Sequence, residues 1–429
     1  MKTKNKTLLF KLQTLLFVPL LLEALGLIDV PDIVPLSIAI AIPVFLKKEE
    51  IVPYIVGFSM MGTGIQVAYI SLSCLVCLLV KNKWKFTPKQ ILIPLIVIAY
   101  ELIHMLFSPT DDIVEGIRFF CVYTLLFYAL FKDKESDEIE LIARNQINST
   151  VFVIIHVFIE TLNLLNGRIE IMFAGDLRLG HQTELIDELT FSSDPNLLGQ
   201  SCIIAIALVV LLIYKKRFHW NQAVAICVCM FGGMMTLSKT FLISAVLLLV
   251  LSVLGIKSNK SGEKTLWYKL LFLILVGVAI TVFLSIYPEY FDNILNRVDE
   301  SDPTTGRVNL AFEYFSVLSD NIIALGFGLG LQNVGEKVGL SGSPHAAIVE
   351  LLITWGIIGL LFVVVVLIMA ILHHVKKKER TFMNFVPLII YSVIVQSTQL
   401  FRLRDKVLAI IVLISVVGLS KKENRLTSD

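Results

Sequence analysis

Long apolar stretches separated by short polar ones dominate the pattern of this chain. The stretches Leu270–Tyr287, Ile348–Leu372 and Phe385–Leu400 each approach the roughly 20 residues that a helix needs to cross a bilayer. No stretch alternates apolar and polar residues with a period of two, so we expect helices and not the strands of a membrane barrel. The pattern therefore predicts an all-α protein that crosses the membrane many times.

The composition agrees with this prediction. Of the 429 residues, 56% are hydrophobic and 17% are charged, and the mean hydropathy is +0.80. The basic start, Met1–Lys6, leads into an apolar run without a small-residue cleavage site, so we interpret it as a retained first helix. Because no repeat or soluble stretch interrupts the pattern, we expect residues 1–429 to form a single integral membrane domain.

Clusters of lysine recur between the apolar stretches and set the expected orientation. Such clusters mark cytoplasmic loops, so both termini should be cytoplasmic. For all clusters to share one side, residues 51–80 must cross twice with a bend near Gly62–Gly64, and residues 222–256 must cross twice with a bend near Ser238–Lys239. The result is about 12 to 14 transmembrane helices. The clusters are Lys2/Lys4/Lys6, Lys47/Lys48, Lys81/Lys83/Lys85/Lys89, Lys132/Lys134, Lys215/Lys216, Lys257/Lys260/Lys264, Lys376–Lys378 and Lys421/Lys422.

Two long loops then lie outside, residues 166–194 and the larger 288–343. Both are rich in acidic residues, and the cations on this side are mostly arginines. A guanidinium presents a planar fork of donors that suits phosphate oxygens, so this outward set indicates an anionic ligand. The alternative is that each arginine pairs with acidic residues of its own loop. The set comprises Arg168, Arg178, Arg297, Arg307, Arg402 and Arg404.

Ionisable residues inside or beside the apolar runs fall in the outer halves of the expected helices. Charges within a membrane usually face a cavity or a partner, so the set predicts a polar vestibule that opens outward. Glu101 and His104 share one helix face. Glu23 and Glu160 also fit a position at the headgroups. The remaining members are Glu115, Arg118, His156, Lys239 and Glu350.

The end of the second outer loop carries further candidates. Ser343 and Pro344 suit the start of a helix, which places His345 at the positive end of the helix dipole, where a neutral ring could accept a proton. Free amide groups there could also hold a phosphate. The alternative is a histidine that only lies at the interface. Gly326-Phe327-Gly328-Leu329-Gly330 lacks a Walker or Rossmann context, so we expect a tight turn that exposes its backbone.

In order and spacing, these motifs resemble the carboxyl-terminal signature of the O-antigen ligase and Wzy-type polysaccharide polymerase superfamily. The resemblance spans roughly Arg178 to Gly359. Where such proteins commonly have His-Asn and an arginine, this chain has His345-Ala346 and Lys239. The residues that carry the resemblance are Asp194-Pro195-Asn196, Ser238-Lys239-Thr240, Thr305-Gly306-Arg307, Gly326–Gly330, His345–Leu352 and Trp355–Gly359.

The resemblance implies a GT-C-like glycosyltransferase that inverts the anomeric carbon and needs no metal or cofactor. Its donor would be an oligosaccharide linked to undecaprenyl diphosphate, used on the outer face of the bacterial cytoplasmic membrane. We expect Arg178, Arg307 and Lys239 to bind the diphosphate and stabilise it as it leaves. His345 would activate the acceptor hydroxyl. Asp194, Asn196, Gly328, Gly330 and Glu350 would help to bind or orient the substrate.

Three functions remain open at this point. Polymerisation of repeat units into a capsule, O-antigen or exopolysaccharide is favoured over ligation, because nothing in the sequence identifies a lipid A core acceptor. A transporter or flippase of lipid-linked glycans should present its cations near the midplane and to both sides. The resemblance also implies the partners: the lipid-linked donor and acceptor, the bilayer, and flippase and chain-length regulator proteins. It implies no nucleic acid partner.

Overall fold

The computed structural model describes residues 8–60, 65–108, 111–173, 177–181, 189–191, 194–217, 219–254, 285, 289, 292, 307–340, 346–375, 381–394 and 406–421. Throughout these ranges every regular element is a helix. Among the described residues, five helices are long and apolar enough to cross a membrane: Pro88–Phe107, Ile113–Leu130, Ser136–Leu164, Pro195–Tyr214 and Ala347–Val375. The chain is an all-α, multi-pass membrane protein, as the sequence predicts.

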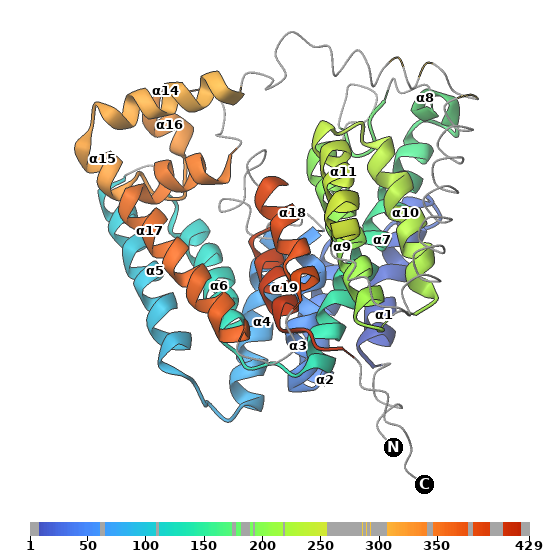
Figure 1. Cartoon of the computed structure of the whole chain (residues 1–429), viewed down its shortest axis with the longest axis horizontal. Helices are drawn as coiled ribbons and strands as arrows, with labels where there is room; N and C mark the ends of the chain where they lie inside the picture. Colours follow the sequence, from blue (N-terminus) through green and yellow to red (C-terminus); the bar gives the residue numbers. More distant parts are fainter. Residues whose placement is uncertain are drawn as a thin grey trace.

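The first half of the chain forms helices that run back and forth through the bundle in Figure 1. Polar caps mark several starts. Thr87 begins one helix by a reciprocal capping box with Gln90, and Asp112 begins the next by accepting from the Val114 amide. The elements are α1 Leu8–Ala24, α2 Ile33–Phe45, α3 Lys48–Val56, η1 Gly57–Met60, α4 Ile65–Lys81, α5 Pro88–Phe107, α6 Ile113–Leu130, α7 Ser136–Leu164, α8 Ile169–Phe173 and α9 Pro195–Tyr214.

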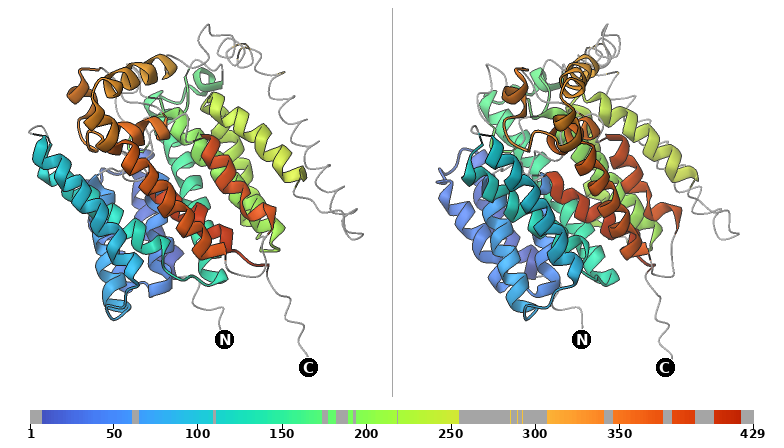
Figure 2. Two further views of the ribbon diagram at one scale, coloured as in Figure 1. Left: turned by 60° about the vertical axis from the view of Figure 1, so that its left-hand side comes forward. Right: turned by 90° about the vertical axis from the view of Figure 1, so that its left-hand side faces the viewer.

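The second half completes the bundle, and the views of Figures 1 and 2 show α14, α15 and α16 beyond the end of α17. The predicted span Ile348–Leu372 lies within α17. The predicted bend at Ser238–Lys239 is confirmed, because one helix ends and the next begins there. The elements are α10 Asn221–Met235, α11 Lys239–Leu254, α14 Arg307–Ser319, α15 Ile322–Phe327, α16 Val334–Val338, α17 Ala347–Val375, η2 Phe382–Asn384, α18 Val386–Ile394, η4 Lys406–Leu408, α19 Ala409–Ser415 and η5 Val416–Gly418.

Some predicted features fall outside the described residues. These are the bend at Gly62–Gly64, the span Leu270–Tyr287 apart from Ser285, and the end of the span Phe385–Leu400, whose start contains α18. The first crossing expected between residues 51 and 80 is a short one. Helix α3 has 9 residues and therefore rises about 14 Å, roughly half the thickness of a bilayer core.

The lysine-rich segments that the structure describes gather at one end of the bundle. The Lys132 ammonium donates to the Lys48 carbonyl at 3.5 Å, and Arg217 donates to the Ser420 carbonyl at 3.0 Å. The hydroxyls of Ser136 and Ser420 are 2.5 Å apart. The last described residues therefore lie at the lysine-rich end, and Figure 1 shows that α1 starts at the same end. That this end faces the cytoplasm stays a prediction.

Helix packing separates a large core from a small one. The large core joins buried residues from α1 to α19. The small one consists of Tyr314, Leu318, Ala324, Val334 and Ile353, which belong to α14, α15, α16 and α17. Residues 307–340 of the predicted second outer loop thus form a helical cap that packs on the first turns of α17.

Candidate functional site

Arg178 joins three segments at the end of the bundle opposite the lysines. Its Nε donates to the Thr236 carbonyl at 2.8 Å, and its Nη2 donates to Asn196 Oδ1 at 3.1 Å. The next residue, Leu179, donates its amide to the Met235 carbonyl at 2.9 Å. The loop before α9 is therefore fastened to the turn between α10 and α11, with the guanidinium half-buried among them.

Two helices begin beside this arginine. Asp194 caps α9 by accepting from the Asn196 amide at 2.8 Å, and Pro195 suits the first helical position. Ser238 precedes α11, accepts from the Phe241 amide at 3.4 Å and donates to Asn196 Oδ1 at 3.3 Å. Because Lys239 is the first residue of α11, the positive dipole end of α11 lies beside Arg178 and beside the start of α9, which the Asp194 carboxylate caps. This is an environment suited to an anion.

Small residues let α9 and α11 start this close together. A Cβ at Gly199 would lie 3.0 Å from Thr236 Oγ1 and 3.1 Å from the Ser238 Cβ. The turn itself requires Leu237 in a left-handed conformation, with φ 47°. The geometry of the anion-suited group, Arg178, Asp194, Asn196 and Lys239, thus depends on a tight contact beneath it.

The glycine-rich segment 326–330 packs against a break in α17. Gly356 has φ 65° and ψ −169°, so α17 is kinked at this residue. The amides of Leu329 and Gly330 donate to the carbonyls of Ile353 and Thr354, both at 2.8 Å. A Cβ at Gly328 would lie 2.3 Å from the Thr354 oxygen. The exposed backbone expected of this turn is largely paired with α17.

Side chains of α5 hold this junction from the other side. Glu101 is 1% exposed and accepts from the Leu331 amide at 2.7 Å and from the Trp355 indole at 2.9 Å. The Tyr100 hydroxyl is 2.8 Å from the Phe327 carbonyl and 3.0 Å from the Trp355 carbonyl. His104 Nε2 is also 2.9 Å from the Phe327 carbonyl. Glu101 is therefore the centre of a buried hydrogen-bonded junction.

The remaining predicted residues are Glu350, Arg307 and His345, and the structure describes the side chain of Glu350 alone among them. Glu350 is fully buried in the first turn of α17. Arg307 is the first residue of α14, which packs on α15 and α17, but its side chain lies outside the described structure. His345 also lies outside the described residues, two positions before α17 begins.

The structure thus arranges the predicted residues in two groups at the same end of the bundle. Arg178, Asp194, Asn196 and Lys239 form one, and Gly328, Gly330 and Glu350 lie at or near the cap on α17. The sequence missed that Glu101, Tyr100 and Trp355 form a junction. An acidic residue inside an apolar run was the available signal. No three of the described His, Cys, Asp and Glu residues come together as a candidate metal site.

A comparison with known protein families matches the part of the chain that holds the cap, most of α17 and Lys239. Residues 223–364 match the O-antigen ligase family model. The O-antigen ligase match covers about a third of the chain and includes Lys239, Arg307, Gly328, Gly330, His345 and Glu350. It starts after Arg178, Asp194 and Asn196, which the fold brings to its edge through Thr236 and Ser238.

This match is consistent with the resemblance to the O-antigen ligase and Wzy-type superfamily. The matched family suggests a membrane glycosyltransferase-like enzyme and lipid-linked polysaccharide substrates. No curated protein and no solved structure gives a significant match to the chain.

Proposed function

We propose that this protein is an inverting, metal-independent glycosyltransferase that polymerises oligosaccharide repeat units carried on undecaprenyl diphosphate. The observation that carries the proposal is the anion-suited group. Arg178, Lys239 and the first turns of α9 and α11 meet at the end of the bundle opposite the lysine-rich end. Together with the O-antigen ligase match, this supports a diphosphate-binding site on the outer face of the bacterial cytoplasmic membrane.

In the proposed reaction, an acceptor sugar hydroxyl attacks the anomeric carbon of the donor. The bond from that carbon to the phosphate oxygen breaks, and the electron pair leaves with the diphosphate. Arg178, Arg307 and Lys239 stabilise the negative charge that develops on this group. His345 takes the hydroxyl proton. Attack from the face opposite the leaving group inverts the configuration.

Residues around these groups would position the reactants. Asn196 fixes Arg178 by accepting from its guanidinium at 3.1 Å, and Asp194 fixes the first turn of α9. Gly328 and Gly330 set the close contact between the cap and Thr354 and Trp355 of α17. Glu350 would orient substrate or neighbouring side chains from inside the first turn of α17.

A ligase that transfers the finished glycan to a separate acceptor is the second candidate, because the matching family model carries the description O-antigen ligase. Purified protein in detergent, given lipid-linked repeat units alone, distinguishes the two. A polymerase makes a ladder of longer glycans and releases the carrier diphosphate, whereas a ligase makes no ladder without its acceptor. Product formation without a closed compartment also excludes pure transport.

The same assay tests the diphosphate site. Arg178→Ala removes the guanidinium between α9 and the α10–α11 turn, and we expect elongation to fall by about 100-fold or more. Arg168→Ala is the matched control, because Arg168 is exposed in the same predicted outer loop and, among the described residues, donates to the neighbouring Leu165 carbonyl alone. Full activity in Arg178→Ala would remove this residue from the mechanism.

A further inference from the structure

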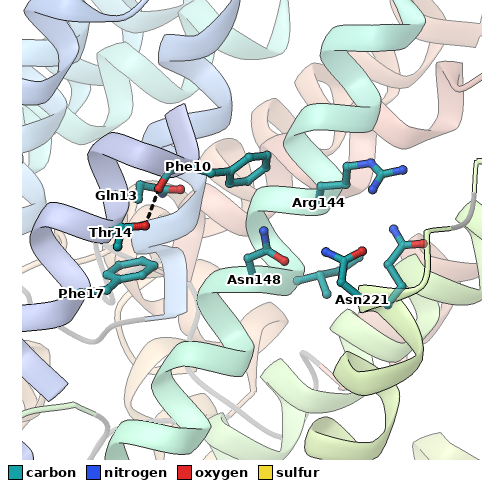
Figure 3. Close-up of a pocket in the computed structure, with 9 residues that line it drawn as sticks. Phe10, Gln13, Thr14, Phe17, Arg144, Asn148 and Asn221 are labelled. Carbon is teal, nitrogen blue, oxygen red and sulfur yellow. Dashed lines mark hydrogen bonds between the residues drawn. The ribbon is translucent and has the colours of Figure 1, made fainter. Parts of the chain in front are cut away.

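A second polar site lies at the lysine-rich end, away from the proposed reaction. Figure 3 shows a cavity between α1, α7 and the start of α10. Its volume is about 360 Å³, which is large enough for a small ligand or a lipid headgroup. One part of its lining is apolar, from Phe10, Phe17 and Ile147. The polar part includes Arg144, Asn148, Asn221 and Gln222.

Gln222 lines this cavity and carries an unsatisfied donor. Its side chain is 2% exposed, and its Oε1 accepts from the His219 amide at 2.9 Å. This bond fixes the orientation of the side-chain amide, and Nε2 has no hydrogen-bond partner among the residues that the structure describes. A buried donor without a partner costs about 1–3 kcal/mol. An acceptor from a ligand would remove that cost.

The surroundings favour an anionic acceptor. Arg144 forms an ion pair with Glu140, which accepts from its Nε at 2.8 Å, and its Nη2 also donates to the Arg217 carbonyl at 2.7 Å. These bonds fix the guanidinium at the lining of the cavity. Asn221 and Gln222 are the first residues of α10, a helix of 15 residues whose positive dipole end therefore borders the cavity. A guanidinium, side-chain amides and a helix start are the donors that phosphate groups use.

The side chains around the cavity indicate that the phosphate belongs to a lipid. Trp220, just before α10, is 79% exposed, as expected for a tryptophan at the level of lipid headgroups. Next to the lining residues, Leu15 and Val18 on α1 and Val224 on α10 are exposed apolar side chains. The cavity thus joins an anion-suited interior to surfaces that acyl chains would cover.

We propose that this cavity binds a membrane phospholipid, with the phosphate held by Gln222, Arg144 and the start of α10. The acyl chains would pass along Phe10, Phe17 and the exposed apolar side chains of α1 and α10. Basic pockets between membrane helices are established sites for lipid headgroups. A bound phospholipid would fasten α1 to α7 and α10. The site is independent of the proposed glycan chemistry.

Native mass spectrometry of the full-length, delipidated protein tests the proposal. Phosphatidylglycerol is titrated into the protein, and inorganic phosphate is titrated separately. We expect a saturable complex with one lipid per chain. Gln222→Met keeps the length of the side chain and removes the donor, so binding should weaken about tenfold. Asn221→Ala, at an exposed position, should also weaken lipid binding and should leave folding unchanged.

The matched control uses two asparagines of one helix. Asn148→Leu alters the cavity, whereas Asn163→Leu changes an exposed asparagine near the other end of α7. We expect the first to weaken lipid binding and the second to leave it unchanged, with similar thermal unfolding for both. Equal lipid binding by all four variants would overturn the proposal. Saturable binding of inorganic phosphate without binding of lipid would overturn the assignment to phospholipid.

Discussion

At the scale of single residues, two side chains carry most of the arrangement at the site end. Arg178 bonds to the Thr236 carbonyl and to the Asn196 side chain, so its forked shape matters as much as its charge. Glu101 accepts from two donors, the Leu331 amide and the Trp355 indole, and so joins α5 to both the cap and α17. Each links segments that are distant in the sequence.

Glu101→Gln should therefore destabilise the protein. A glutamine has one acceptor oxygen, so its amide nitrogen would face either the Leu331 amide or the Trp355 indole, donor against donor. We expect a loss of about 1–3 kcal/mol and a lower thermal unfolding temperature in detergent. Glu115→Gln is the control, because it weakens a partly exposed ion pair with Arg118 that is worth about 0–1 kcal/mol. Equal unfolding temperatures for the two variants would contradict the role of Glu101.

At the scale of elements, α17 and the 326–330 segment form one unit. The kink at Gly356 and the left-handed Gly328 bring two backbones into direct contact. A Cβ at Gly356 would lie 2.3 Å from the Gly326 oxygen. The same contact holds the first turns of α17 at a fixed angle to the rest of the helix.

Substitution of these glycines separates close contact from backbone strain. Gly356→Ala and Gly328→Ala introduce both a clash and an unfavourable φ, so we expect each to cost more than about 2 kcal/mol and to reduce elongation. Gly339→Ala keeps the strain at φ 68° without a clash and should cost about 1 kcal/mol. Gly326→Ala meets nothing within 4 Å and should be tolerated. Thermal unfolding that ranks Gly326→Ala with Gly356→Ala would contradict this account of the junction.

The sequence predicted those parts of the fold that depend on local pattern. The helical class, the bend at Ser238–Lys239 and the lysine-rich end follow from hydrophobicity, short polar interruptions and charge. The kink at Gly356 could not be predicted, because the glycine lies in an unbroken apolar run and its conformation depends on Gly326–Gly330. The half-length α3 also needs a partner outside the local pattern, since the Asn145 side chain donates to the Pro53 carbonyl at 2.7 Å.

For the site, too, the sequence identified individual residues but not the contacts between distant segments. The outward arginines identified Arg178, the ionisable residues within the apolar runs identified Lys239, and the family resemblance added Asp194 and Asn196. The fold brings these together. Their mutual contacts pass through the Thr236 carbonyl and the Ser238 hydroxyl, which no charge pattern reveals. The roles assigned to Arg307 and His345 stay predictions that depend on the family resemblance.

At the scale of the whole molecule, the two proposed polar sites lie at opposite ends of one helical bundle. Arg178, Lys239 and the cap on α17 lie at one end, and the lysine-rich segments with the proposed phospholipid cavity lie at the other. The proposed reaction requires the first end to face away from the cytoplasm. A lipid-linked donor is then the available source of activated sugar, since nucleotide sugars are cytoplasmic.

Labelling of single cysteines in intact cells tests this orientation most directly. With the six native cysteines replaced, Arg168→Cys reports on the site end and Lys85→Cys on the lysine-rich end, and both positions are exposed. A membrane-impermeant maleimide should label Arg168→Cys in intact cells and Lys85→Cys only after the membrane is opened. The reverse pattern would place the anion-suited group in the cytoplasm and contradict the proposed function.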